Sequence, residues 1–318
     1  YFVIEGDEYD TSLFDKRSKF FHYLPDRLII NNIEFDHADI FNDIEEIKRA
    51  FSLMLRQIPR DGLIIVNGDD ENAMAVAKTG FTPFITFGTG STCDAVIRNI
   101  ATLADTPDQT FELVFKNQIY PLRIPLLGEY NVRNSVAVVL LALHEGIKIE
   151  TIQEALLSFK NVRRRLQLLT KNDQVRVFDD FAHHPTAIVE TLKAVRAAWP
   201  DAGIHAIYEA RSNTSVRQFH QSRMAECFAA ADSVTFYKLF RGERINDAER
   251  LDLKQIVAEL NENGKPAWVV EELDLIVEAC LNRAKSGDIF LVMSNGAFGS
   301  IQHKLAGKLD QRWQNQNH

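Results

Sequence analysis

Short apolar runs alternate with longer amphipathic stretches in the first part of the chain. The runs are rich in β-branched and aromatic residues, as buried strands are, and they occupy residues 1–5, 27–33, 62–68 and 82–88. Between two of them, residues 43–58 repeat apolar positions at helical spacing. Strands that alternate with helices form parallel sheets covered by helices. The pattern therefore predicts an α/β domain built on a mostly parallel sheet.

The pattern changes after residue 93. Three strand-like runs follow one another with no helical pattern between them, at residues 94–100, 110–115 and 118–126. Consecutive strands joined by short turns pair in the antiparallel sense. We therefore expect an antiparallel edge on the sheet, followed by helices at residues 131–144 and 150–159.

The alternation of strands and helices restarts after Asn161. Further apolar runs lie at residues 175–181, 203–209, 233–238, 267–270 and 288–294. Helical patterns at residues 186–198 and 216–230 separate the first of these runs. The pattern predicts a second, Rossmann-like α/β domain, with domains at 1–158 and 159–318. Because the chain opens within an apolar run and without Met, we expect its first domain to be incomplete at the N-terminus.

Composition narrows the classes of function. The net charge of -8 argues against a broad nucleic-acid surface. No apolar stretch approaches the roughly 20 residues that a membrane helix needs, so no membrane insertion is expected. The 3 cysteines lack the spacing of a disulfide scaffold or a zinc site. These features favour a cytoplasmic location and leave the oligomeric state open.

Acidic side chains follow two of the first strands. Glu5 ends the first run, and the second leads into Glu34, Asp36 and His37. Open α/β sheets bind ligands at the carboxyl ends of their strands. Carboxylates with one imidazole suit Mg²⁺ or Mn²⁺ that bridges nucleotide phosphates. The alternative is a solvated acidic turn with a surface histidine.

Polar side chains also mark the starts of two helices. Asn131 and Asn134 lie three residues apart on one face of the helix predicted after Gly128, where each can cap the helix or bind a ligand. In the second domain, His183 and His184 precede a helix whose N-terminus favours anions. The preceding strand ends in Asp179 and Asp180, and a carboxylate at this position can bind ribose hydroxyls.

Arginines form the third group of candidates. Residues 163–165 are three consecutive arginines near the domain boundary, suited to phosphate oxygens or to a solvated basic face. Arg211, Ser212 and Asn213 follow the strand at residues 203–209. There a guanidinium can bind a substrate carboxylate in bidentate fashion. The alternative is that Ser212 or Asn213 caps the next helix and Arg211 is solvated.

Seven motifs, taken in order along nearly the whole chain, resemble those of the Mur ligases: EGDEYD, NNIEFDH, GEYNVRN, VRRRL, DDFAHHPT, EARSNT and VMSNGAFG. The resemblance implies an ATP-binding central domain at 1–158 and the family's C-terminal domain at 159–318. It also implies amide-bond formation, in which ATP activates a carboxylate as an acyl phosphate and an amine then attacks it. The segments FDKRSKFFHYLPDR and EARSNT resemble those members that join L-alanyl-γ-D-glutamyl-meso-diaminopimelate to UDP-N-acetylmuramate in bacterial peptidoglycan recycling.

The resemblance also implies roles for individual residues. Glu5 and His37 match the magnesium ligands, and Asn131 and Asn134 match asparagines of the ATP site. Arg165 matches an arginine that faces the phosphates, and Asp180 matches the ribose-binding aspartate. We expect His183 and His184 to contribute to the nucleotide site, and residues 211–213 to contact the incoming peptide.

One departure from the family keeps other functions open. The G-x-x-G-K-[ST] phosphate loop of the family is not in this sequence, and we expect it upstream of Tyr1. Without that loop the chain by itself should bind ATP poorly and be inactive. The alternatives are a ligase that adds free L-alanine and a non-catalytic nucleotide-binding module. A dehydrogenase would need a G-x-G-x-x-G turn, which neither domain shows.

Overall fold

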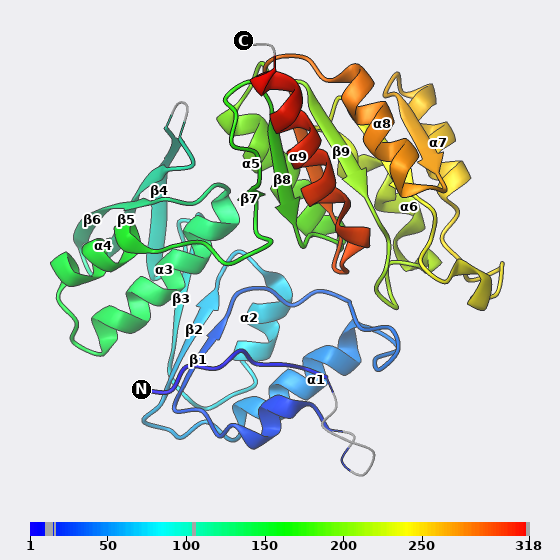
Figure 1. Cartoon of the computed structure of the whole chain (residues 1–318). Helices are drawn as coiled ribbons and strands as arrows, with labels where there is room; N and C mark the ends of the chain where they lie inside the picture. Colours follow the sequence, from blue (N-terminus) through cyan, green and yellow to red (C-terminus); the bar gives the residue numbers. More distant parts are fainter. Residues whose placement is uncertain (10–14, 16, 104–105, 316–318) are drawn as a thin grey trace. The chain divides into compact units, whose positions relative to one another are not determined.

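The computed structural model describes residues 1–9, 15, 17–103 and 106–315 (Figure 1). The chain forms two compact units, one from residues 1–103 and 107–159 and the other from residues 160–318. The predicted division lies between residues 158 and 159. No helix of the described ranges is long and apolar enough to cross a bilayer.

The first unit contains a mixed sheet. Within the described residues its strands lie in the order β1-β2-β3-β4-β5-β6. Their bounds are Arg27–Ile30, Leu63–Asn67, Phe84–Gly88, Ala95–Thr102, Gln109–Phe115 and Gln118–Ile124. Pairing is parallel from β1 to β4 and antiparallel from β4 to β6. The predicted parallel sheet with an antiparallel edge is confirmed.

Helices cover both faces of the parallel part of this sheet. They are α1 (Ile44–Leu55), α2 (Glu71–Ala77), α3 (Glu129–His144) and α4 (Ile149–Ser158). Side chains of β2 alternate between two cores: Leu63 and Ile65 pack on the side of α3, and Ile64 and Val66 pack on the side of α1 and α2. A strand buried on both faces has a continuous apolar sequence. This explains why the run at residues 62–68 shows no polar alternation.

The second unit contains a sheet in the order β11-β10-β9-β12-β8-β7 among the described residues. Its strands, from β7 to β12, are Gln167–Leu168, Arg176–Asp180, Ile204–Tyr208, Ser233–Tyr237, Ala267–Val270 and Ile289–Met293. All neighbours are parallel except β7 and β8, which are antiparallel. The predicted second α/β fold is confirmed, although β7 was not predicted.

Helices also cover both faces of the second sheet. The longer ones are α5 (Pro185–Ala198), α7 (Leu253–Glu262), α8 (Leu273–Arg283) and α9 (Ile301–Gln314). Side chains of β12 again alternate: Leu291 lies in the core with α5 and α7, whereas Phe290 and Val292 lie in the core with α8 and α9 (Figure 1). The carboxyl ends of the parallel strands therefore share one edge, where ligands bind in such sheets.

The prediction of a strand at residues 1–5 is wrong. These residues have no assigned strand, and the side chains of Tyr1, Phe2 and Val3 are 88 to 100% exposed. An apolar run becomes a strand only when its N–H and C=O groups pair with a neighbour. Among the described residues, β1 pairs with β2 only, and residues 1–5 do not extend the sheet beyond it.

The helix predicted at residues 216–230 is interrupted. The segment forms three short pieces, η2 (Gln218–His220), α6 (Gln221–Met224) and η3 (Glu226–Phe228). Its start is held by another part of the chain, because Gln218 N–H donates to Glu249 O and Leu251 N–H donates to Val216 O. These bonds keep residues 216–218 outside a helix, despite their helical apolar spacing.

Candidate functional site

At the first sheet, His37 contacts a carboxylate other than the predicted one. His37 follows β1, and its Nε2 pairs with the carboxylate of Glu8. Burial lowers the pKa of His37, but Glu8, Asp36 and Asp39 outweigh this effect, and the pKa lies above its ordinary value. Glu5 is exposed, and within the described ranges no hydrogen bond or ion pair joins it to His37. The sequence pattern favoured Glu5 over Glu8 as the partner of His37, because Glu5 directly ends the apolar run.

The residues around His37 fit a magnesium ion only in a water-rich site. No group of three or more His, Cys, Asp or Glu side chains in the described part of the chain is arranged to hold a metal. Asp7, another carboxylate of the EGDEYD motif, pairs with Lys19 Nζ at 2.9 Å, and Asp10 of the same motif lies outside the described residues. Mg²⁺ in nucleotide enzymes commonly uses one or two side chains, with water and phosphate completing its shell. Glu8 and His37 match that limited set.

Asn131 and Asn134 differ in their contacts. The Nδ2 group of Asn131 donates to Leu127 O at 2.7 Å, which secures the start of α3. Asn134 is exposed one turn later, and its Oδ1 accepts a bond of 2.6 Å from Asn31 Nδ2 at the end of β1. Asn134 thus presents its amide at the carboxyl edge of the sheet. Asn131 has a structural bond there already.

The three consecutive arginines have separate environments. Arg164 is used internally: its Nη2 donates to Gly296 O at 2.7 Å, and its Nε lies 3.5 Å from Asp179 Oδ2. Arg165 is exposed, with its Cζ 5.4 Å from the ring centroid of Phe181. Arg165 is therefore the better placed of these two for a phosphate. The internal role of Arg164 was missed, because the RRR run alone does not distinguish its members.

Asp180 is almost completely buried, at 2% exposure. Its carboxylate accepts bonds from Leu166 N at 2.6 Å, Ala182 N at 2.8 Å and Thr191 Oγ1 at 3.5 Å. Burial raises the pKa of Asp180, and this effect exceeds the lowering by the bonds from Leu166 N and Ala182 N. A carboxylate has about four acceptor positions, so three of those of Asp180 are occupied by donors of the protein itself. This arrangement gives Asp180 a structural role that the sequence did not indicate.

The two histidines after β8 contact the protein itself. The side chain of His184 is the N-cap of α5 and accepts a bond from Thr186 N at 3.4 Å. Nδ1 of His183 lies 3.1 Å from Phe181 O. Both rings therefore stabilise the turn between β8 and α5. Their main-chain and ring atoms still lie at the carboxyl edge predicted for a nucleotide.

A buried carboxylate and an arginine follow β9. Glu209 is 2% exposed, and its Oε2 accepts a bond of 2.6 Å from Ser294 Oγ, next to β12. Burial raises the pKa of Glu209, while Ser294 and the charges of Arg211 and Arg164 act in the opposite direction. Nη1 of Arg211 lies 3.8 Å from Glu209 Oε1. Arg211 is thus held at the edge of the sheet while 31% of its side chain stays exposed.

Ser212 has the local role that the alternative prediction gave it. Its Oγ accepts a bond of 3.0 Å from Ser215 N, as a capping serine does. This cap closes a turn and not a regular helix, since η2 begins only at Gln218. Asn213 is exposed, and its carbonyl oxygen accepts a bond of 2.8 Å from Arg217 Nη1. Of the three predicted peptide-binding residues, Arg211 has the geometry best suited to a ligand.

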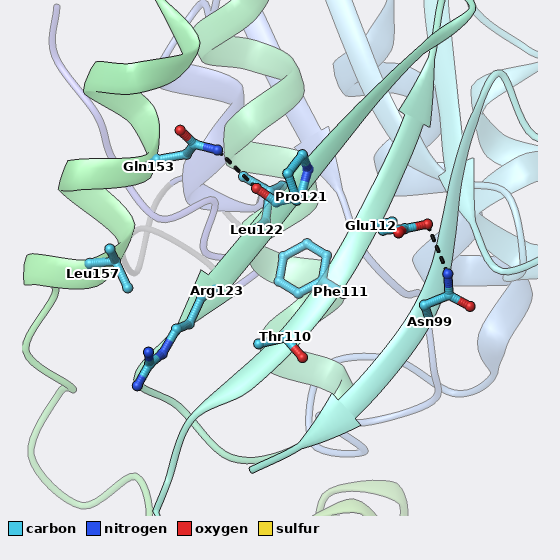
Figure 2. Close-up of a pocket in the computed structure, with 9 residues that line it drawn as sticks. All are labelled: Asn99, Thr110, Phe111, Glu112, Pro121, Leu122, Arg123, Gln153 and Leu157. Atoms are coloured by element: carbon cyan, nitrogen blue, oxygen red, sulfur yellow. Dashed lines mark hydrogen bonds between the residues drawn. The ribbon is translucent and has the colours of Figure 1, made fainter.

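A cavity of about 520 Å³ lies elsewhere in the first unit, against strands β4 to β6 and helix α4 (Figure 2). Most of its polar side chains already have partners. Asn99 donates to Glu112 at 2.8 Å, Gln153 donates to Pro121 O at 2.9 Å, and Arg123 pairs with Asp108. None of the predicted site residues lines it. The cavity therefore offers little unsatisfied polarity to a ligand.

Both units are α/β folds that place polar groups at the carboxyl edges of their sheets. These features are typical of two-domain α/β ligand-binding proteins. Comparison with protein families is more specific. The Mur ligase middle domain matches residues 1–142, and the Mur ligase, glutamate ligase domain, matches residues 164–296. The chain therefore belongs to the Mur ligase family.

Individual relatives support the same assignment. A ligase of Haemophilus influenzae, UDP-N-acetylmuramate–L-alanyl-γ-D-glutamyl-meso-2,6-diaminoheptandioate ligase, is 37% identical over 97% of this chain and 65% of its own length. The Escherichia coli protein of the same name is 36% identical over 96% of this chain and 64% of its own. The crystal structure of a murein peptide ligase from Psychrobacter arcticus has a TM-score of 0.66 and 32% identity, covering 98% of this chain and 63% of that one. The chain thus spans less than two thirds of these relatives.

Proposed function

We propose that this chain provides the middle and C-terminal domains of an ATP-dependent ligase that joins L-alanyl-γ-D-glutamyl-meso-diaminopimelate to UDP-N-acetylmuramate. The observation that carries the proposal is the 37% identity over 97% of the chain to a relative named for that reaction. The reaction belongs to peptidoglycan recycling in the bacterial cytoplasm. ATP and Mg²⁺ are the cofactors that this function requires.

Activation of the muramyl carboxylate is a phosphoryl transfer, for which charge neutralisation is the main requirement. Arg165 is exposed and suited to contact phosphate oxygens. Asn134 is suited to bind the nucleotide through its exposed amide, and Asn131 supports the helix start beneath it. Asp180 has one acceptor position left for a ribose hydroxyl after its three internal bonds.

His37 and one carboxylate of residues 5–8 would hold Mg²⁺. The resemblance to the family favours Glu5, whereas the contact in the structure favours Glu8. When bound, the ion would neutralise phosphate charge. The protein's own contribution is to keep an imidazole and a carboxylate together at the edge of the sheet.

The peptide enters with its free amine toward the activated carboxylate and its other carboxylates toward the protein. Arg211 suits one of these carboxylates, because a guanidinium donates two parallel bonds to a carboxylate. Glu209, which itself accepts a bond from Ser294, holds Arg211 from the buried side. Free L-alanine has no second carboxylate for this arginine. The site therefore favours a peptide substrate over the amino acid.

The test is an assay of ADP release by the protein made from its complete coding sequence. UDP-N-acetylmuramate, ATP and Mg²⁺ are supplied with either the tripeptide or free L-alanine, and the product is identified by mass spectrometry. We expect ADP release and the amide product with the tripeptide only. Activity with L-alanine alone would assign the chain to the L-alanine-adding branch. ATP binding without turnover of either substrate would indicate a non-catalytic nucleotide-binding module.

A further inference from the structure

One phenylalanine in the second unit lies against two guanidinium groups. The Cζ of Arg211 is 3.9 Å from the ring centroid of Phe240, and the Cζ of Arg241 is 5.0 Å from it. Phe240 follows β10, and Arg211 follows the neighbouring strand β9. Two strand ends at the carboxyl edge of the sheet therefore bring two cations to one aromatic ring.

Arg211 is held there by groups on several sides. Glu209 pairs with it at 3.8 Å, and Phe240 N–H donates to Ala210 O at 3.4 Å. Gly296 leaves the necessary space, because a Cβ on this residue would lie 2.0 Å from Arg211 Cδ. A cation on an aromatic face gains attraction while the edges of its plane keep their N–H donors. Arg211 is thus oriented but still able to bind an anion.

Arg241 differs because its charge has no acidic partner in the described part of the chain. It is exposed and has φ 53°, a left-handed conformation that non-glycine residues adopt rarely. Two other arginines of this region do have such partners: Arg250 pairs with Asp247, and Arg217 pairs with Glu249. Arg241 therefore adds an uncompensated positive charge beside Arg211.

We propose that Phe240 holds Arg211 and Arg241 as a two-cation clamp that binds two carboxylates of the incoming peptide. This inference rests on the proposed function and adds Arg241 and Phe240 to the residues that determine specificity. Two guanidiniums at one ring repel each other, so a ligand with two carboxylates relieves more charge than a ligand with one. Free L-alanine has a single carboxylate and cannot bind both guanidinium groups in this way.

The test compares Arg241→Ala and Phe240→Leu with a matched control, Arg283→Ala. Arg283 also lies over an aromatic ring, with its Cζ 4.5 Å from the Trp268 centroid, but it contacts Ser233 at the start of β10. It is therefore at the opposite edge of the sheet. In the complete ligase, we expect Arg241→Ala to raise the KM for tripeptide about tenfold, since a charge-assisted bond contributes that much. Phe240→Leu should raise it about threefold, with the KM for ATP unchanged in both.

A peptide series identifies the contact. Tripeptides in which one carboxylate at a time is replaced by a carboxamide are compared on wild type and Arg241→Ala. Wild type and Arg241→Ala should have equal KM for the peptide that lacks the carboxylate bound by Arg241, because that peptide cannot form the bond with either protein. The clamp is refuted if Arg241→Ala matches wild type with the unmodified tripeptide, or if its defect is the same for every peptide.

Calorimetric titration of the tripeptide into the protein made from the complete coding sequence, as wild type and as Arg241→Ala, separates this inference from the proposed function. If wild type binds the peptide and Arg241→Ala binds it about tenfold more weakly, the clamp stands even when ligation is not observed. If wild type ligates the tripeptide but both proteins bind it equally, the ligase function stands and the clamp is wrong. If wild type does not bind it at all, the clamp is also wrong.

Discussion

The carboxyl edges of the two sheets are built differently. At the first sheet, Glu5 and Asn134 are exposed and have few contacts with the rest of the protein. At the second sheet, Asp180 and Glu209 are each 2% exposed. Asp180 accepts a bond from Leu166 N, 14 residues away, and Glu209 accepts one from Ser294, 85 residues away. The first edge is thus open, and the second is interlocked before any ligand arrives.

This difference shows how each edge obtains its order. Burying a carboxylate is unfavourable unless hydrogen bonds or charges compensate it, and burial raises the pKa of both Asp180 and Glu209. The contacts of these two carboxylates also hold the loops that carry Arg165 and Arg211 in position. The open edge has no such network around Glu5, so a ligand that binds there would contribute more to its order.

The sharpest test of the interlocked edge is Asp180→Ala. The change leaves Leu166 N, Ala182 N and Thr191 Oγ1 without their acceptor, and an unsatisfied buried donor costs about 1–3 kcal/mol. We expect the free energy of unfolding of the second unit to fall by roughly 3–4 kcal/mol. Urea denaturation followed by tryptophan fluorescence measures it, because Trp199, Trp268 and Trp313 all lie in this unit.

Glu5→Ala is the matched control for Asp180→Ala. Glu5 is an exposed carboxylate in the other unit, so its removal should change stability by no more than about 0.5 kcal/mol. A similar small change for Asp180→Ala would show that the bonds around this carboxylate contribute little, and the contrast between the edges would disappear.

The open edge is tested by activity. If His37 is the proposed metal ligand, His37→Ala in the complete protein should lower kcat at least about a hundredfold, or roughly 2.7 kcal/mol. Stability should be almost unchanged, because the variant loses only a group that would help to neutralise phosphate charge. Glu5→Ala and Glu8→Ala are measured beside it, and the true carboxylate ligand should show the same loss. Near-normal rates in all three variants would remove the metal site from this edge.

Arg211→Ala tests the specificity role proposed for the interlocked edge. Loss of one charge-assisted pair should raise the KM for tripeptide about tenfold, or roughly 1.4 kcal/mol, and leave the KM for ATP unchanged. Steady-state kinetics with each substrate varied in turn provides both constants. An effect on ATP alone would place Arg211 in the nucleotide site.

The smallest effects are expected for substitutions of Asn131 and Asn134. Asn131→Ala removes the bond to Leu127 O and should destabilise the first unit by about 1 kcal/mol. Asn134→Ala, at an exposed position, should leave stability nearly unchanged and raise the KM for ATP. Thermal unfolding followed by circular dichroism, together with kinetics, distinguishes the two. Equal loss of stability in both variants would contradict the separate roles.

The fold was largely predictable because each central strand can be recognised from its own residues. The sequence of β2, LIIVN, is buried at every position, and such runs are visible without knowledge of the partner strands. The carboxyl edges followed from the same pattern. Failures occurred where remote contacts decide, as in residues 216–218, which bond to a loop more than 30 residues away.

The candidate site was predictable only as a set of positions. Sequence indicates which residues end strands, but the pairing of Glu209 with Ser294 joins residues 85 apart. Likewise, the separate environments of Arg164 and Arg165 depend on Gly296 and Phe181. These contacts are set by the order of strands in the sheet, which no spacing within a single motif can specify.

The first four residues, which are apolar and exposed but belong to no strand, have a practical consequence for production of the protein. Tyr1 and Arg27 both donate to Glu145, which brings the exposed apolar segment close to β1, an edge strand among the described residues. Open strand edges with nearby apolar side chains promote association between molecules and aggregation. Preparations of these 318 residues alone should therefore lose solubility as concentration rises, a colloidal limit that is independent of catalysis.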